Sequence, residues 1–104
     1  MENTLRRLQT WYRAQCDGDW EHEGGIEIGT LDNPGWRLKV DLTDTILQEI
    51  PFEAQRDRYE DATNWLRAWR DPTTFHVACG PTRLEDALIV FLEWAEQPAT
   101  SKTG

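Results

Sequence analysis

The chain has 104 residues, a formal net charge of −8 and two cysteines. This length suits one domain, and six Trp, two Tyr and three Phe residues supply much of the apolar area that a small core needs. The negative charge opposes direct nucleic-acid binding, since it repels phosphates, and it attracts basic partners. The sequence contains no apolar run of about 18 residues, no signal-peptide block and too few cysteines for a disulfide framework. We therefore expect a cytoplasmic protein outside the membrane.

The first predicted element is a helix over Asn3–Gln15. Leu5, Leu8 and Tyr12 recur at helical spacing while arginines take the other faces, which is typical of a surface helix packed along one stripe. We expect the helix to end at Cys16-Asp17-Gly18, because Asp and Gly favour a turn.

A hairpin is predicted next, with strands at Gly25–Leu31 and Trp36–Leu42. The second strand alternates apolar and polar side chains, so one of its faces is expected to be buried and the other wet. The connection Asn33-Pro34-Gly35-Trp36 predicts a type II turn, because Pro presets φ at the second place and Gly accepts a positive φ at the third.

Three further strands are predicted at Phe52–Tyr59, Asn64–Arg70 and Thr74–Cys79. The turns between them are expected at residues 60–63 and 71–73, where Asp, Thr and Pro gather. The alternation within Asn64–Arg70 favours a strand and is also compatible with a helix.

The last predicted element is a helix that begins at Thr82-Arg83-Leu84-Glu85, a sequence typical of a capping box, and ends near Glu96. This order of elements indicates an α+β fold: an antiparallel sheet of four or five strands flanked by an N-terminal and a C-terminal helix. We assign residues 1–97 to this single domain and residues 98–104 to a flexible C-terminal tail.

The segment from Cys16 to Trp36 stands apart because it contains many acids and no Lys or Arg. Its glycines give the loop before the first strand conformational freedom. We expect Trp20 to be exposed at an interface, because it lies among these acids and Trp side chains often anchor a partner. The acidic residues of the segment are Asp17, Asp19, Glu21, Glu23, Glu27 and Asp32.

Metal binding and acid–base catalysis both fit this segment poorly. Asp17, Asp19 and Glu21 match the first ligands of an EF-hand loop, but such a loop needs Gly at its sixth position and an acid at its twelfth. His22 and Ile28 stand there instead, so we predict no metal site and no cofactor. The carboxylates beside His22 are chemically suited to proton transfer, but their spacing matches no catalytic motif.

Cys79 is a candidate nucleophile, because it precedes a helix N-terminus whose dipole lowers the pKa of a thiol. A small sulfurtransferase-like enzyme that uses Cys79 is therefore an alternative function. Only Gly80 and Pro81 separate this cysteine from the helix cap, however, and it ends an apolar run. A buried core cysteine is the favoured interpretation.

The chain resembles the immunity protein 53 family at Trp11-Tyr12, at Gln15–His22 and at Thr30–Trp36. The resemblance implies a bacterial protein that protects its producer from a cognate polymorphic toxin, and relatives are sometimes labelled rhodanese-related sulfurtransferases. The family supplies no catalytic residues to carry over. Together with the acidic loop, it points to one partner-binding surface made of Asp17, Asp19, Trp20, Glu21, His22, Glu23, Asp32, Asn33 and Trp36.

Our leading hypothesis is a non-enzymatic immunity protein that binds and neutralises a toxin domain through this acidic loop. A nuclease toxin is indicated by charge alone, because a basic active site attracts carboxylates as it attracts phosphates. The alternative role for the loop is structural: Asp17 or Asp19 caps backbone amides and Trp20 packs inward.

Overall fold

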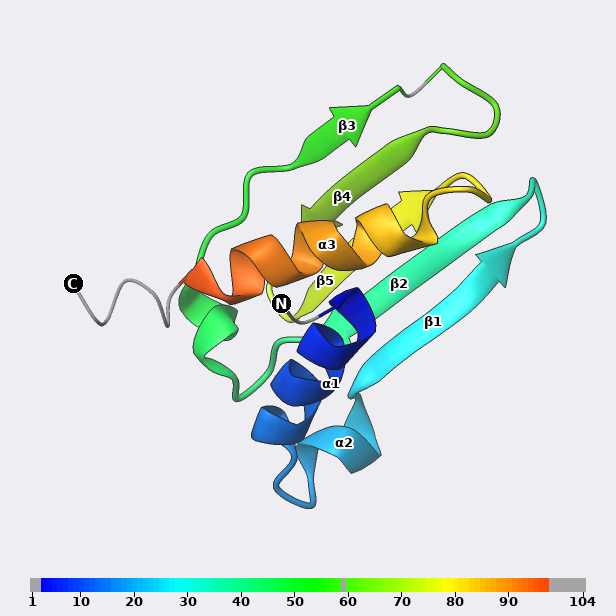
Figure 1. Cartoon of the computed structure of the whole chain (residues 1–104). Coiled ribbons are helices and arrows are strands. Elements are labelled where there is room, and N and C mark those ends of the chain that lie inside the picture. Colours follow the sequence, from blue (N-terminus) through cyan, green and yellow to red (C-terminus); the bar gives the residue numbers. More distant parts are fainter. Residues whose placement is uncertain (1–2, 59, 98–104) are drawn as a thin grey trace.

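The computed structural model describes residues 3–58 and 60–97, and Figure 1 shows the path of the chain. Two long helices, a single-turn helix, a 3-10 helix and five strands follow one another along the described residues. In order they are α1 (Thr4–Gln15), α2 (Trp20–Glu23), β1 (Ile26–Leu31), β2 (Gly35–Asp41), η1 (Ile46–Glu49), β3 (Gln55–Asp57), β4 (Leu66–Arg70), β5 (Thr74–Cys79) and α3 (Leu84–Ala95). The predicted tail, residues 98–104, lies outside the described residues.

The strands form one open antiparallel sheet in the order β1-β2-β5-β4-β3. α1 and α3 lie beside each other over one face of this sheet (Figure 1), and Arg7 of α1 forms an ion pair with Glu96 at 2.8 Å. No described helix covers the opposite face, which we call the open face. The predicted α+β class, with an antiparallel sheet flanked by an N-terminal and a C-terminal helix, is confirmed.

The core lies between the two long helices and the sheet. Alternation along β2 and β5 turns Leu38, Val40, Phe75 and Val77 toward the helices, where all four are fully buried. Phe91 of α3 meets Phe75 with ring centroids 5.2 Å apart. Burial of such apolar area contributes about 25 cal/mol per Å² and is the main term that holds helices and sheet together.

α1 confirms the predicted helix, but its buried stripe is rotated from the expected one. Leu8 is buried, whereas Leu5 is 62% exposed and Tyr12 is 39% exposed. Thr4 takes the buried place instead, and its hydroxyl donates to the Glu85 carboxylate of α3 at 2.9 Å. The stripe follows the position of α3, which the periodicity of one helix does not specify.

The turn between β1 and β2 differs from the predicted type II turn. Gly35 already belongs to β2 and has no positive φ. A glycine is required there for a different reason, since an added Cβ would collide with the carbonyl oxygen of Cys79 on β5.

The capping box predicted at the start of α3 is wrong. The Thr82 hydroxyl donates to the Thr63 carbonyl at 2.8 Å, and Glu85 accepts from the Thr4 hydroxyl. Arg83 occupies the N-cap position but makes no side-chain capping bond, and its guanidinium donates instead to the Asp86 carboxylate of the first turn at 2.8 Å. Both expected capping side chains therefore connect α3 to other elements.

The middle of the chain departs most from expectation. β4 and β5 confirm the second and third predicted strands, and β4 excludes the helix alternative. The strand predicted at Phe52–Tyr59 is much shorter, because β3 has only three residues, and η1 precedes it where the sequence has no clean period. Arg70 of β4 holds this segment in place. Its guanidinium donates at 2.6–2.9 Å to the carbonyl oxygens of Leu47, Gln48 and Ile50.

Candidate functional site

The first part of the acidic segment, residues 17–21, is a short turn whose backbone amides donate to the carboxylates of the turn itself. Asp17 accepts the backbone N–H groups of Asp19 and Trp20 at 2.9 and 3.0 Å. Glu21 accepts those of Asp17 and Gly18 at 2.9 and 2.8 Å. These amides lie just before or at the start of α2, so the two side chains cap the turn reciprocally.

The same hydrogen bonds lower the pKa of both carboxyl groups. For Asp17 the largest cause is the N–H of Trp20, followed by that of Asp19. For Glu21 the largest cause is its own backbone N–H, and the amides of Asp17 and Gly18 add to it. Both groups are ionised at neutral pH, and the amides of the chain itself already engage their charge.

Trp20 packs inward. Its side chain lies in the core with 5% of the residue exposed, and its indole N–H donates to the Asp41 carbonyl at 2.9 Å. Its ring meets that of Trp11 nearly at right angles, with centroids 5.7 Å apart. The prediction of an exposed Trp20 is therefore wrong, and the structural alternative is confirmed for Trp20 and for Asp17.

The other acidic and polar residues of the predicted surface lie in two separate places. Asp19, His22 and Glu23 are exposed on α2 and the turn before it. Asp32 and Asn33 are exposed in the turn at the far end of the β1–β2 hairpin (Figure 1). The six residues of β1 separate the two places by about 20 Å, at about 3.3 Å per residue. The predicted residues therefore do not form one continuous surface.

Trp36, the last residue of the predicted surface, is half-buried near the start of β2. Its indole N–H donates to the Pro81 carbonyl at 3.1 Å, and its backbone pairs with Cys79 of β5. Trp36 thus connects the hairpin to the chain that enters α3.

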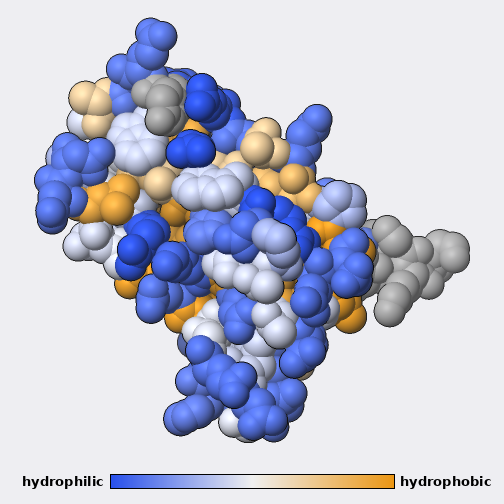
Figure 2. All heavy atoms as spheres, turned by 180° about the vertical axis from the view of Figure 1, so that it is seen from behind, coloured by the Kyte–Doolittle hydropathy of each residue, from blue (hydrophilic) through white to orange (hydrophobic). Residues whose placement is uncertain are grey.

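A polar hollow of about 470 Å³ lies beside α2, on the open face of the sheet. Figure 2 shows the molecule from behind, where hydrophilic side chains predominate over the sheet. Glycine at position 24 keeps the hollow open, because an added Cβ would collide with the Asp41 side chain. The charged and titratable residues that line the hollow are Glu23, Glu27, Lys39, Asp41, Asp71 and His76.

His76 and Asp71 form a close pair in this hollow. The His76 Nε2 atom lies 2.9 Å from the Asp71 carboxylate, and the His76 ring stacks on Trp69 with centroids 5.0 Å apart. The hydrogen bond from His76 is the largest of the causes that lower the pKa of Asp71 to about 2. Asp71 also accepts the backbone N–H groups of Thr73 and Thr74, so it orders the turn between β4 and β5.

The sequence reasoning missed Lys39, Asp41, Asp71 and His76 as site residues. They come from β2, from β5 and from the turn before β5, and their spacing along the chain forms no motif. The one available signal was strand alternation, which places the polar residues of β2 and β5 on the same face. The register that sets Lys39 opposite His76 depends on pairing between distant strands.

A row of arginines crosses the open face beside the hollow. The register sets Arg37 opposite Ala78, Ala78 opposite Arg67, and Arg67 opposite Arg56. The Arg67 guanidinium lies over the Trp69 ring, 4.3 Å from its centroid. The open face therefore has an acidic end beside α2 and a basic middle, although the chain as a whole is strongly negative.

Cys79 is fully buried at the end of β5, and this burial raises the pKa of its thiol. A thiol in these surroundings neither meets a substrate nor ionises readily, so the geometry disfavours sulfur transfer. Within residues 3–58 and 60–97, no three His, Cys, Asp or Glu side chains form a group that could hold a metal ion. No helix in this part of the chain has the length and apolar character needed to cross a membrane.

The chain is thus a small α+β domain with a charged sheet face and a buried thiol. The chain matches the sequence model of Immunity protein 53 over residues 5–96. It belongs to the immunity protein 53 family, as the resemblance predicted. Membership supports an immunity role in general and indicates binding as the mode of action. No curated protein and no solved structure gives a significant match.

Proposed function

We propose that this protein binds a cognate toxin domain in the bacterial cytoplasm and neutralises it through an acidic surface beside α2. This α2 acidic surface consists of Asp19, Glu23, Glu27, Asp41 and Asp71. The observation that carries the proposal is that the last four of these carboxylates line one polar hollow. Asp19 lies at the N-terminal end of α2 and extends the surface.

The electrostatics of the hollow favour a basic partner. Carboxylates in a concave site focus their field and increase the rate at which a positively charged surface arrives. The pKa of Asp71, about 2, keeps this carboxylate charged throughout the physiological range. A toxin with a basic active site, as in a nuclease, would meet these oxygens where it otherwise meets phosphate oxygens.

The buried part of the acidic segment serves this surface indirectly. The Trp20 ring is anchored to α1 and β2, and the carboxylates of Asp17 and Glu21 fix the turn before α2. Asp19 and Glu23 are therefore held in position before a partner arrives, which reduces the entropic cost of binding. Asp32 and Asn33 stand outside the surface that we propose.

Reversal of two exposed charges tests the proposal. Asp19→Lys with Glu23→Lys should weaken binding to the C-terminal domain of the toxin encoded beside this gene by about tenfold or more, because two attractive charges become repulsive. Both side chains are exposed, so the free energy of unfolding should change by less than about 0.5 kcal/mol. Glu21 is left unchanged because its carboxylate caps the turn.

Glu53→Lys with Glu93→Lys is the matched control. It makes the same change in net charge at exposed positions beside the C-terminal half of α3. Affinities are compared by titration calorimetry, and protection is compared by survival of cells that express the toxin domain. If the Asp19 and Glu23 variant binds as tightly as the control, the α2 acidic surface is not the interface. If the wild-type protein does not bind, the proposed function is wrong.

A further inference from the structure

The outer edge of β1 presents unpaired peptide groups. At the end of β2, the Asp41 N–H donates to the Gly25 carbonyl on the β1 side at 2.9 Å. The next amide, that of Leu42, points the opposite way and donates to the Thr73 carbonyl on the β5 side at 2.8 Å. Along an antiparallel strand the backbone N–H and C=O groups of successive residues point to opposite sides. In β1 the groups of the odd-numbered residues therefore point toward β2 and bond to it. The N–H and C=O groups of its even-numbered residues, 26, 28 and 30, therefore point away from the sheet.

Among the features that usually protect a sheet from adding a strand, this edge has only one charged side chain, that of Glu27. β1 is six residues long and contains neither Pro nor Lys, and no described element lies beyond it (Figure 1). The opposite edge strand, β3, has only three residues. Exposed edges are usually kept short or interrupted by Pro or Lys, so β1 is the edge that is open to pairing.

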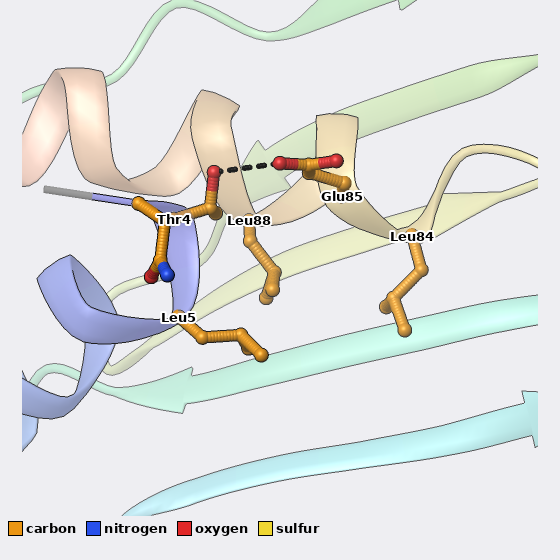
Figure 3. A pocket seen from close by; sticks show the side chains of 6 residues that line it. Thr4, Leu5, Leu84, Glu85 and Leu88 are labelled. Carbon is orange, nitrogen blue, oxygen red and sulfur yellow. Dashed lines mark hydrogen bonds between the residues drawn. The ribbon is translucent and has the colours of Figure 1, made fainter.

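Exposed apolar side chains accompany the edge on the helix side of the sheet. Ile28 is 43% exposed, although Leu38 opposite it on the same face is fully buried. Leu5 of α1 is 62% exposed and lines a hollow of about 360 Å³ together with Leu84 and Leu88 of α3. Figure 3 shows these leucines extending from the two helices over the side of the sheet that carries β1 and β2.

We propose that the edge of β1 takes up an extended segment of the toxin domain as a sixth strand of the sheet. The added strand would bond to the outward peptide groups of Ile26, Ile28 and Thr30. Its alternate apolar side chains would cover Ile28 on the helix side, toward Leu5. This inference rests on the proposed function, since it names a second part of the same toxin contact.

Charge complementarity defines the chemistry of the incoming strand. Glu27 projects from β1 on the open face with 64% of its side chain exposed, where it forms a long ion pair with Arg37 of β2 at 3.6 Å, and Glu23 lies just before the strand. An added strand places its own side chains beside Glu27, so basic residues on that face are favoured. A second copy of this chain would instead bring another net charge of −8 to the same edge, which favours a basic toxin strand over self-pairing.

Amide hydrogen exchange, followed by NMR, tests the inference on the unmodified protein. In the free protein the amides of Ile26, Ile28 and Thr30 should exchange rapidly, while those of Glu27 and Gly29 are protected by β2. Addition of the C-terminal toxin domain should slow exchange at the three outward amides by about tenfold or more.

Three other results of the exchange experiment would contradict the inference, and each has a different meaning for the proposed function. A complex that leaves the three outward amides unprotected overturns strand addition and leaves the proposed function intact. Absence of a complex overturns both. Protection that appears without toxin and grows with protein concentration shows that the edge pairs with a second copy.

A variant pair gives an independent readout. Ile28→Pro removes one outward N–H without removing a bond to β2, so the sheet should still form, whereas Ile28→Val keeps the N–H and the β-branched shape. The proline variant should lose about tenfold or more in toxin affinity, which corresponds to about 1.4 kcal/mol. The valine variant should bind like the wild type, and equal affinity of a folded proline variant would overturn the inference.

Discussion

The Trp20 indole connects three parts of the molecule. Its ring packs against Trp11 of α1, its N–H binds the Asp41 carbonyl at the end of β2, and its backbone begins α2. A buried aromatic with a satisfied polar atom contributes both apolar area and a specific orientation. The acidic turn is therefore fixed against the helix layer and against the end of the hairpin.

Trp20→Ala should destabilise the domain by about 3–5 kcal/mol, because it removes a buried ring and leaves a cavity. The free energy of unfolding is measured by urea titration followed by circular dichroism. A variant that keeps the wild-type urea midpoint while losing toxin binding would show that the ring contacts the partner.

Asp71→Asn should show a pH-dependent loss of stability. The pKa of Asp71 is depressed to about 2 in the folded protein, so its contribution is fully present above the ordinary value of 3.8 and is lost as the pH falls through about 2. Asn keeps an oxygen for the amides of Thr73 and Thr74. Because the side chain is 47% exposed, solvent screening limits the difference to about 1 kcal/mol or less.

Urea titrations of wild type and Asp71→Asn at about pH 7 and about pH 2 measure this difference. Convergence of the two proteins at the lower pH is expected. A gap that stays constant across this range would show that the pair with His76 contributes nothing through its charge.

Among the elements, η1 owes its place to β4 and not to its own sequence pattern. The Arg70 guanidinium binds three carbonyl groups of the η1 segment and two more at Asp71 and Pro72. One rigid cation thus satisfies backbone acceptors that have no strand partner.

Arg70→Met should cost about 2–3 kcal/mol of stability, because carbonyl groups lose a charged donor. Arg67→Met is the matched control on the same strand but on the open face, and its cost should stay near 1 kcal/mol, the size of a cation–π contact. Thermal unfolding compares the two variants. Equal midpoints would contradict the assigned role of Arg70.

The same elements show what the sequence can predict. The existence of β2, β5, α1 and α3 follows from hydrophobic periodicity. β2, β5 and α3 also bury the regular face that the period predicts, whereas α1 buries Thr4 and Leu8 and leaves Leu5 and Tyr12 exposed. η1 and the start of α3 do not follow from periodicity. The Arg70 guanidinium holds η1, the Thr82 hydroxyl holds the start of α3, and the hydrogen-bond partners of both side chains are distant in the sequence. Local pattern therefore identifies elements with a face to bury and misses those held by tertiary hydrogen bonds.

The candidate site shows the same limit. The acidic composition of the loop is visible in the sequence, but the inward packing of Trp20 and the capping by Asp17 and Glu21 depend on the folded turn. The contributions of Asp41 and Asp71 to the hollow depend on strand pairing and register, which alternation alone does not determine.

At the scale of the whole molecule, the charge is unevenly distributed. Carboxylates gather beside α2, whereas Arg37, Arg56 and Arg67 cross the middle of the open face. A partner that approaches the open face is therefore oriented as well as attracted, since its basic part is drawn to one end. This arrangement fits the proposed role, in which the protein captures a basic toxin domain.

The salt dependence of association with the toxin domain tests the central claim most directly. We predict that the association rate constant, measured by stopped-flow fluorescence, falls by about tenfold or more between about 0.05 and 0.5 M NaCl, because screening weakens the attraction of the α2 acidic surface. The variant with Asp19→Lys and Glu23→Lys should start from a slower rate and change less. A wild-type rate that does not change with salt, or a toxin domain that does not bind, would contradict the account.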